Sequence, residues 1–298
     1  MIRSPQRFTR NKDTVRTLQR ETIERCLAPR LGRLRYFGLP SSALADAIAW
    51  QDLFEKFYAV ERGVKGKEWE LQHDLGLEAF RAGLLGKISL LRGDIDLLIR
   101  RKRDEFGNRV PFPFDVVSLD YSGGLFYKNR RGNFTRLQAI AALVAHQGAK
   151  RSDFVLLISC NLDQIDQGEV RRTLENVRTE LVRYGANGEQ VVDAYLGHEL
   201  EEARLKVYVP HFVNQEAAKN RYSCDTQQVI MYEGNLKTRM MAFRFVLSHD
   251  TRTESLRSPR ERLSQVFNKP VLGVVGGEPK ETTLGLPKLT VPEVPRTG

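Results

Sequence analysis

The sequence is poor in cysteine, and nothing in it is long and apolar enough to span a membrane. Its three cysteines, Cys26, Cys160 and Cys224, are far apart among 298 residues and follow no CxxC or Cys/His spacing. This excludes a disulfide framework and indicates no zinc site, so we expect three buried thiols. No apolar run approaches the roughly 20 residues of a membrane helix, and no signal-peptide pattern follows the basic start. We therefore expect a soluble, cytoplasmic protein with no membrane partner.

Acidic residues are fewer than basic ones, and the imbalance is uneven along the chain. Lys and Arg number 47 against 37 Asp and Glu, which gives a formal charge of +10. Residues 1–35 alone hold ten basic and three acidic residues. Because excess positive charge favours polyanionic partners, we expect residues 1–33 to form a basic lead-in whose helix, about 12–31, docks to nucleic acid.

Hydrophobic residues make up 41% of the chain, enough for a large core, and this excludes a wholly disordered protein. Short apolar runs alternate with segments of helical period, a pattern typical of an α/β sheet covered on both faces. The predicted strands are 34–38, 56–60, 87–91, 114–119 and 154–159, followed by an antiparallel hairpin of 228–232 and 240–247. The predicted helices are 43–54, 67–85, 95–104, 137–145, 168–184 and 190–205, the last two within a helical insertion at about 163–220.

The last part of the chain differs in composition. Six prolines fall within the forty residues after Arg257, with little helical or strand periodicity. We expect residues 251–298 to be a Pro/Gly-rich tail that is extended or disordered, and residues 34–250 to form the folded domain.

Polar residues that end predicted strands are the first candidates for a site, because ligands of open α/β sheets bind beyond the carboxyl ends of the strands. Glu61 ends the second strand, where its carboxylate is either solvated or accepts hydrogen bonds from two ribose hydroxyls. Asp94 either caps the following helix or accepts from an adenine amino group. Asp120 and Tyr121 precede two glycines, and we expect them to place a carboxylate and a ring against a flat substrate.

Basic residues cluster just after this fourth strand. The segment 128–136 is either a solvated loop or a surface that binds phosphates and stacks bases. Its candidate nucleic-acid-binding residues are Lys128, Arg130, Arg131 and Arg136. A second basic run, 100–103, is interpreted as the exposed end of a helix, where positive charge suits the helix dipole.

The order of the elements and the strand-end acids resembles the class I S-adenosylmethionine-dependent methyltransferase family over residues 34–249. The similar motifs are Ala59-Val60-Glu61-Arg62, Gly93-Asp94, 119–124 and the terminal hairpin. The resemblance implies a Rossmann-like, mostly parallel sheet with an antiparallel C-terminal hairpin and S-adenosyl-L-methionine as cofactor, without a metal. It places the cofactor-binding residues at Gly38, Ser41, Glu61, Arg62, Asp94 and Ile95.

Two motifs qualify this resemblance. Residues 36–42, Tyr-Phe-Gly-Leu-Pro-Ser-Ser, replace the family's glycine-rich first loop with one glycine and a proline, which leaves Gly38 and the backbone of Ser41 and Ser42 to meet a carboxylate. Residues 119–123 are similar to the Leu-Asp-Pro-aromatic-Gly motif of certain tRNA guanine methyltransferases. That likeness implies RNA modification, with Asp120 orienting a base amino group and Tyr121 stacking on the base.

Two alternatives remain open. The first is a methyltransferase-like scaffold that does not catalyse and binds within a nucleic-acid or protein complex, with a protein partner at the N-terminal helix or C-terminal tail. The second is a magnesium-dependent nuclease that uses Asp94 and Asp96, although the next strand lacks the expected lysine. The five histidines show neither ligand spacing nor a nucleophile motif, so a hydrolytic triad is not indicated.

Overall fold

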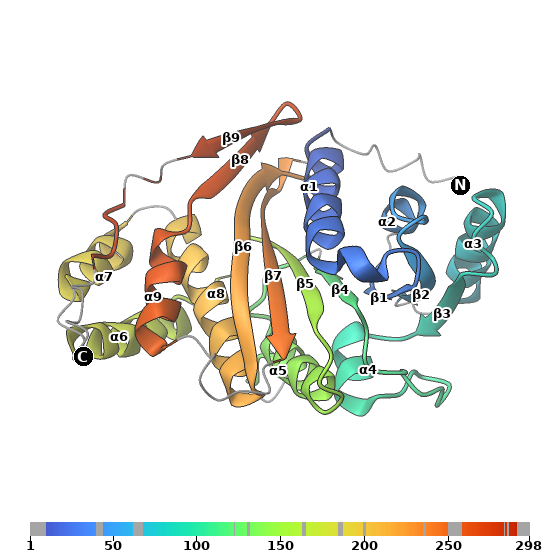
Figure 1. Ribbon diagram of the computed structural model, residues 1–298, viewed down its shortest axis with the longest axis horizontal. Helices are drawn as coiled ribbons and strands as arrows, with labels where there is room; N and C mark the ends of the chain where they lie inside the picture. The colour runs from blue at the N-terminus through green and yellow to red at the C-terminus, as the bar shows by residue number, and fades with distance from the viewer. Residues whose placement is uncertain are drawn as a thin grey trace.

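The computed structural model describes residues 10–39, 44–61, 68–121, 123–129, 132–162, 165–183, 187–198, 201–234, 237–249, 258–282, 284 and 286–290. In this part of the chain the strands form one sheet in the order β3-β2-β1-β4-β5-β7-β6-β8-β9 (Figure 1). Their bounds are β1 Leu34–Gly38, β2 Phe54–Glu61, β3 Ile88–Arg92, β4 Val116–Asp120, β5 Phe154–Asn161, β6 Tyr222–Glu233, β7 Arg239–His249, β8 Val271–Val275 and β9 Glu278–Thr282.

The first five strands are parallel, and the direction changes beyond them. β7 is antiparallel to both β5 and β6, which confirms the predicted hairpin after five parallel strands. β8 is parallel to β6, and β9 is antiparallel to β8. β4 and β5 are buried along nearly their whole length, which is typical of parallel strands covered on both faces.

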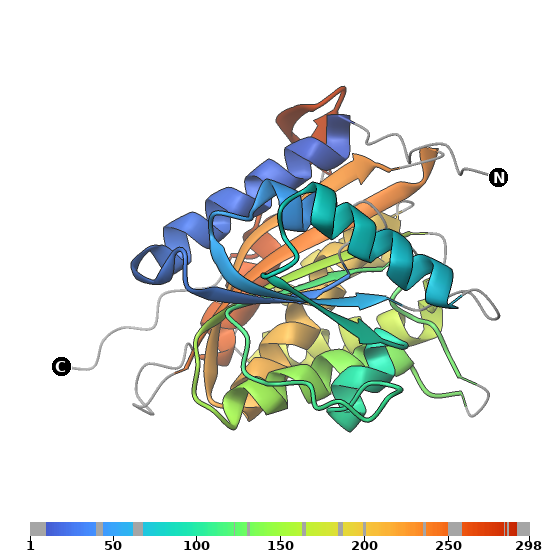
Figure 2. The same cartoon turned by 90° about the vertical axis from the view of Figure 1, so that its right-hand side faces the viewer.

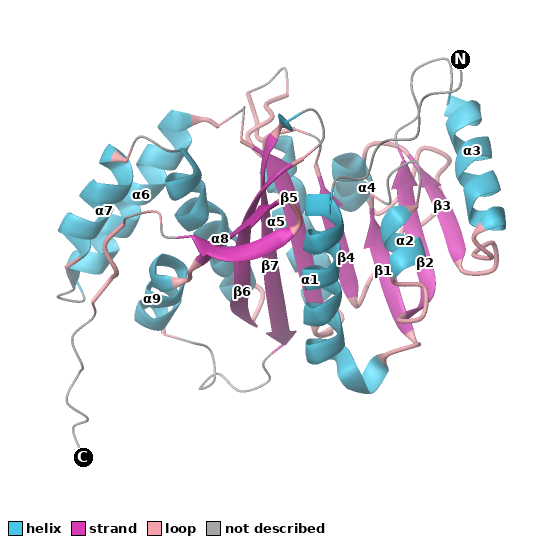
Figure 3. Cartoon of the chain, turned by 90° about the horizontal axis from the view of Figure 1, so that it is seen from above, coloured by secondary structure: helices cyan, strands magenta, loops and turns pink. Residues whose placement is uncertain are grey.

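Helices cover both faces of the sheet, as Figure 2 shows. One face carries α1 Arg10–Leu27, α2 Ala45–Ala49 and α3 Glu68–Arg81. The other carries α4 Ile95–Arg101, α5 Thr135–Gly148 and α8 Glu201–Lys219. The remaining helices, α6 Gln167–Arg183, α7 Gly188–Gly197 and α9 Pro259–Asn268, lie at the end of the molecule away from α3 (Figure 3). None of the described helices is long and apolar enough to cross a bilayer.

The expected basic lead-in is a layer of the fold rather than a separate arm. Within α1, Ile23 and Leu27 belong to the core shared with α2 and α3, and Val15 packs against β6, β7 and β8. A short 3₁₀ turn, Ala28–Arg30, then leads into β1. The helix begins two residues earlier than predicted and ends before Leu31, because Pro29 and Gly32 break the helical hydrogen bonding.

The prediction of an extended or disordered C-terminal tail is wrong for residues 258–282. They form α9, β8 and β9, and Val271 and Val274 of β8 are buried against the sheet. The prolines mark element boundaries here. Pro259 follows the Ser258 capping box at the start of α9, and Pro279 lies in the edge strand β9, where a missing N–H is tolerated.

Two predicted helices differ most from the observed ones. The predicted helix 43–54 is only α2, because Phe54 already belongs to β2 and is fully buried. The predicted helix 190–205 is two helices, α7 and α8, and α8 continues through Pro210 to Lys219. Because α8 packs on β6, it belongs to the helices that cover this face of the sheet. In contrast, α6 and α7 pack against α8 and against each other.

Candidate functional site

The strand order has its switch point where β1 and β4 lie side by side. From β1 the chain proceeds to β2 and β3 on one side, and β4 and β5 lie on the other, which is the topological switch point of an open sheet. Gly38 pairs with Ser118 across this point, and the Leu39 amide donates to the Ser118 carbonyl oxygen at 3.3 Å. The predicted residues Gly38, Glu61, Asp94 and Asp120 therefore lie at one edge of the sheet.

The close approach of β1 and β4 at the switch point requires a glycine at position 38. A Cβ at this position would lie 2.3 Å from the Ser118 backbone oxygen and 2.8 Å from the Tyr36 hydroxyl oxygen. Only glycine fits such an approach of two backbones. Ser41, the other residue expected in this loop, lies outside the described residues.

Glu61 ends β2, and Asp94 follows the end of the neighbouring strand β3. Glu61 is opposite Arg92 in the β2–β3 register, and the Gly93 amide donates to the Glu61 carbonyl oxygen at 3.2 Å. The Asp94 carboxylate accepts from the amides of Asp96 at 3.0 Å and Leu97 at 3.3 Å, which confirms the capping interpretation. The adenine contact of Asp94 stays a prediction.

Of the other two residues of the predicted cofactor set, only Ile95 is described. Ile95 is buried in the core, so its side chain supports α4 from within. Arg62 lies outside the described residues.

Asp120 meets a cation that the sequence did not indicate. Its carboxylate is 34% exposed, and the Lys12 ammonium of α1 lies 3.7 Å from Oδ2. Nearby, burial raises the pKa of Asp46, the Arg16 guanidinium opposes this, and the charge of Asp120 adds to the increase. No local sequence signal pairs Lys12 with Asp120, since 107 residues separate them and only the packing of α1 on the sheet brings them together.

Tyr121 points into the protein. Its side chain is 3% exposed, its hydroxyl donates to Asp96 Oδ1 at 2.9 Å, and the Arg136 guanidinium carbon lies 4.6 Å from its ring centroid. Burial raises the pKa of Asp96 to about 6 and that of Tyr121 well above its usual range. The Arg136 guanidinium therefore already stacks on the Tyr121 ring, whereas the sequence led us to expect a ring that is free to stack on a base. Base stacking by Tyr121 stays a prediction, and it requires Arg136 to move.

The basic loop after β4 is also engaged within the protein. Lys128 pairs with Asp166 and lies 4.7 Å from the Phe134 ring centroid, and Arg136 donates to the Gly124 carbonyl oxygen at 2.5 Å. Arg130 and Arg131 lie outside the described residues. The two described cations of this predicted surface therefore already have partners.

Several basic side chains of the N-terminal helix have acidic partners as well. Arg16 pairs with Asp46 at 2.7 Å and Arg20 with Asp52 at 2.5 Å. Just beyond the helix, Arg30 pairs with Asp115 at 2.6 Å. The expectation that this segment offers its charge to a polyanion is therefore not met by these side chains, because they connect α1 and the turn after it to α2 and to the loops that precede β2 and β4.

The two acids of the nuclease alternative already make other contacts. Asp94 caps α4 and Asp96 accepts from Tyr121, so the two carboxylates serve different partners. Among the described residues, no group of three or more His, Cys, Asp or Glu side chains is placed to hold a metal ion. A two-acid magnesium site at this position is not supported by this geometry.

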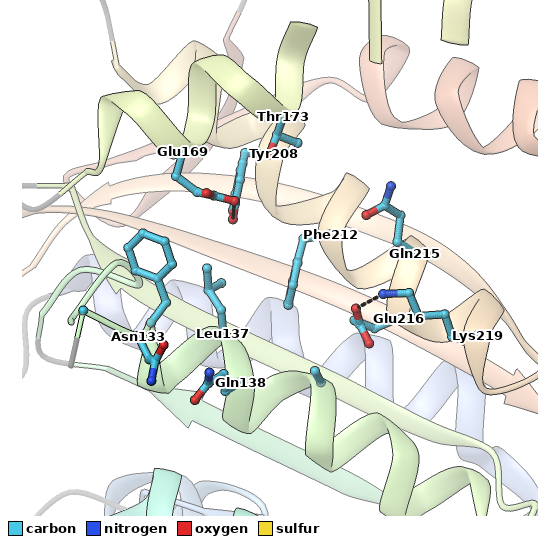
Figure 4. A pocket seen from close by; sticks show the side chains of 13 residues that line it. Asn133, Leu137, Gln138, Glu169, Thr173, Tyr208, Phe212, Gln215, Glu216 and Lys219 are labelled. Atoms are coloured by element: carbon cyan, nitrogen blue, oxygen red, sulfur yellow. Dashed lines mark hydrogen bonds and ion pairs between the residues drawn. The ribbon is translucent and has the colours of Figure 1, made fainter. Parts of the chain in front are cut away.

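A separate hollow of about 420 Å³ lies between α5, α6 and α8 (Figure 4). Tyr208 and Phe212 of α8 face Leu137 of α5 across it, and Glu216 pairs with Lys219 at 2.6 Å at its rim. None of the strand-end acids lines this hollow. It is therefore distinct from the candidate site at the carboxyl ends of the strands.

The cysteine thiols are largely buried, which disfavours reactivity. Cys160 and Cys224 are buried and Cys26 is half-buried, close to the expectation of three buried thiols. Burial raises the pKa of Cys160 to about 12, which opposes thiolate formation.

Among solved structures, several have an arrangement similar to this chain. Precorrin-6y C5,15-methyltransferase from Geobacter metallireducens shares 9% identity over 78% of this chain and 88% of its own, with a TM-score of 0.38. N-methyltransferase NodS from Bradyrhizobium japonicum shares 12% identity over 80% and 98%, with a TM-score of 0.41. The methyltransferase domain of bacterial CtHen1 shares 9% identity over 78% and 100%, with a TM-score of 0.41.

No family model and no curated protein matches the sequence. At these identities and TM-scores no function is transferred from the solved structures, and the fold is assigned from the chain's own strands. Five parallel strands in the order 3-2-1-4-5 are followed by the pair 7-6, with β7 antiparallel to its neighbours. By this order and these directions, the chain has the Rossmann-like fold of class I S-adenosylmethionine-dependent methyltransferases.

Proposed function

We propose that the protein transfers a methyl group from S-adenosylmethionine to an amino group of a nucleic-acid base, with RNA favoured over DNA. The observation that carries the proposal is the placement of Glu61, Asp94 and Asp120 at the carboxyl ends of three parallel strands that flank the β1–β4 switch point. Three carboxylates at one sheet edge provide acceptors for ribose hydroxyls, an adenine amino group and a substrate amino group.

The residues present fit the nucleoside half of this cofactor. Glu61 is half-buried at a strand end, and a carboxylate there can accept from both hydroxyls of a ribose. Asp94 adds a second carboxylate, just after the end of the neighbouring strand β3. The loop that would meet the methionine half, residues 40–43, lies outside the described residues.

When bound, S-adenosylmethionine supplies an electrophilic methyl group. A substrate nitrogen would displace the sulfur from that methyl carbon, so the main contribution of the protein would be alignment of the amino group. The Asp120 carboxylate would orient the amino group and accept the proton that the nitrogen releases. A substrate amino group that reaches Asp120 must compete with the Lys12 ammonium, now 3.7 Å away.

Binding of the cofactor is tested by isothermal titration with S-adenosylmethionine. We expect binding by the wild type and at least a tenfold loss in Glu61→Ala and in Asp94→Ser. Serine keeps the capping of α4 and removes the carboxylate, so Asp94→Ser separates ligand contact from helix stability. Asp52→Asn removes an exposed acid away from the strand ends and serves as control. Absence of any binding by the wild type would contradict the proposal.

Catalysis is tested by transfer of a radiolabelled methyl group to RNA. Asp120→Asn retains the shape of the side chain but cannot take up a proton, and we expect the rate to fall by about 10² to 10⁴-fold. The same variant should bind S-adenosylmethionine as the wild type does. An unchanged rate in Asp120→Asn would remove this residue from the mechanism.

A second candidate function is a non-catalytic, methyltransferase-like binding module. It is favoured because side chains of the candidate site already have partners within the protein: Lys12 pairs with Asp120, and Arg136 covers the Tyr121 ring. Nucleic-acid binding without any S-adenosylmethionine binding would support this function over the first.

A further inference from the structure

The loop that follows α4 concentrates positive charge at the surface. Residues 100–109, here called the basic hairpin, leave the end of α4 and fold back at the side of the molecule (Figure 1). Arg103 and Arg109 face each other across an antiparallel bridge. The hairpin exposes five cationic side chains, namely Arg100, Arg101, Lys102, Arg103 and Arg109.

The two acids of the hairpin are used for other contacts. Asp104 is 7% exposed, and its carboxylate accepts from the amides of Phe106 at 3.0 Å and Asn108 at 2.7 Å and from the Asn108 side chain at 2.9 Å. Glu105 pairs with Arg92 of β3 at 3.3 Å. Asp104 therefore shapes the turn and Glu105 anchors it to the sheet, and neither offsets the charge of the five cations.

None of the five cations forms an ion pair with a carboxylate of the described chain. Arg100 donates to the Gln138 side chain at 3.2 Å, and Arg103 donates to the Gly107 carbonyl oxygen at 3.1 Å. The dipole of α4 favours Arg100 and Arg101 but does not reach Arg109, and two like charges opposite each other in a ladder are unfavourable. This contrasts with α1, where Arg16 and Arg20 are paired with acids.

An aromatic side chain stands at the tip of the hairpin. Phe106 is 64% exposed, and the Arg92 guanidinium carbon lies 5.1 Å from its ring centroid. The Glu105 amide donates to the Arg92 carbonyl oxygen at 3.0 Å, so the tip lies beside the carboxyl end of β3. An exposed ring among unpaired cations is the combination that binds single-stranded nucleic acid, through phosphates and a stacked base.

We infer that the basic hairpin, rather than the N-terminal helix or the loop 128–136, is the surface that binds a nucleic-acid strand. Arg101, Arg103 and Arg109 contact successive phosphates, and Phe106 stacks on a base. The inference deepens the proposed function by assigning its polyanion contact, but it concerns binding alone. It is therefore tested without S-adenosylmethionine, so that its failure and a failure of methyl transfer are distinguishable.

The test is fluorescence anisotropy of a labelled 12-nucleotide single-stranded RNA with the full chain, over a series of salt concentrations. The variant combines Arg101→Gln, Arg103→Gln and Arg109→Gln. We expect its affinity to fall tenfold or more and the slope of log affinity against log salt to decrease by about 2, since each phosphate contact contributes about 0.7 for single strands. The matched control, Lys150→Gln, Arg171→Gln and Arg183→Gln, removes the same charge from exposed positions elsewhere and should change the slope little.

Phe106→Ala tests the stacking contact separately. We expect about a tenfold loss of affinity for the single strand, with the salt slope unchanged, and little loss for inorganic polyphosphate, which has no base. Circular dichroism of each variant should match the wild type. Equal losses in the hairpin and control triple variants would overturn the hairpin as the binding surface, and unchanged RNA affinity in Phe106→Ala would overturn the single-strand assignment. A duplex bound more tightly than the single strand would also contradict it.

Discussion

Asp96 shows how a single buried carboxylate near the candidate site affects stability. Burial raises the pKa of Asp96 to about 6 from its usual value of 3.8. Between these values the folded state binds more protons than the unfolded state, so stability falls as pH rises from about 4 to 6. At pH 7 the ionised group therefore costs up to about 3 kcal/mol.

We expect Asp96→Asn to stabilise the protein at pH 7 by roughly 1–3 kcal/mol and to have little effect near pH 4. The amide oxygen can still accept from the Tyr121 hydroxyl, so the contact is retained while the charge is removed. Urea denaturation at the two pH values measures this difference. Asp74→Asn, at an exposed position on α3, is the control, and a less stable Asp96→Asn at pH 7 would contradict the electrostatic argument.

Gly38 is the second residue whose surroundings predict the effect of a substitution on stability. An added methyl group would lie 2.3 Å from the Ser118 backbone oxygen, so β1 and β4 must separate to admit it. We expect Gly38→Ala to destabilise the fold by about 3 kcal/mol or more, at the upper end of overpacking effects.

The control for Gly38→Ala is Gly76→Ala in α3, where a Cβ would meet nothing within 4 Å. Alanine there should stabilise the helix by about 0.5–1 kcal/mol. Chemical denaturation distinguishes the two substitutions by the opposite signs of their effects. Similar stabilities for both variants would show that the β1–β4 approach is not tight.

At the scale of elements, α1 is held to the sheet by apolar packing and by one well-buried ion pair. Arg16 and Asp46 are each about 15% exposed or less, whereas Asp52, the partner of Arg20, is 59% exposed. Removing one member of a buried pair leaves an uncompensated charge, and removing one member of an exposed pair has a small effect.

We expect Arg16→Met to destabilise the protein by roughly 3 kcal/mol and Arg20→Met by less than about 1 kcal/mol. Asp46→Asn combined with Arg16→Met should recover most of the first loss, because it removes the unpaired carboxylate. Thermal and urea denaturation of the single and double variants measure this coupling. Additive losses in the double variant would show that the two side chains do not act as a pair.

The packing of α1 also changes how its positive charge is interpreted. Deleting the first thirty residues would remove Ile23 and Leu27 from the core, so loss of nucleic-acid binding after that deletion could reflect unfolding. Substitutions in the basic hairpin avoid this difficulty because its cations are exposed.

At the scale of the whole molecule, one continuous sheet joins the early strands to the C-terminal segment. β8 pairs with β6, the turn before β9 accepts a hydrogen bond from Thr14 of α1 at 2.6 Å, and α9 packs on α8. Elements from both ends of the chain therefore stabilise each other.

We expect a single cooperative unfolding transition in which the C-terminal segment does not unfold first. In a Trp69→Phe variant, which leaves the fully buried Trp50 as the one tryptophan, fluorescence, far-UV circular dichroism and hydrogen exchange in β8 should give coincident midpoints. Loss of protection in β8 well before the Trp50 transition would indicate that residues 258–282 are an independent appendage.

Periodicity and strand-end chemistry predicted much of this fold. Strands such as 154–159 are continuous apolar runs, and their burial on both faces leaves little ambiguity. The C-terminal segment was missed because β8 and β9 are short, β8 follows Pro270 and β9 contains Pro279. Their stability comes from the pairing of β8 with β6, far away in the sequence, and of β9 with β8. The extension of α8 was missed because packing on the sheet outweighs the cost of Pro210 within the helix.

The sequence by itself determined that acids end the second and fourth strands and follow the third, since alternation and turn residues act locally. Only the tertiary structure decided which charges remain available. Lys12 meets Asp120, Arg16 meets Asp46 and Tyr121 meets Asp96 through packing between distant segments, whereas the cations at 100–109 keep no acidic partner in the described chain. A count of charges along the sequence is local, and neutralisation depends on contacts of a few ångströms that only the folded chain creates.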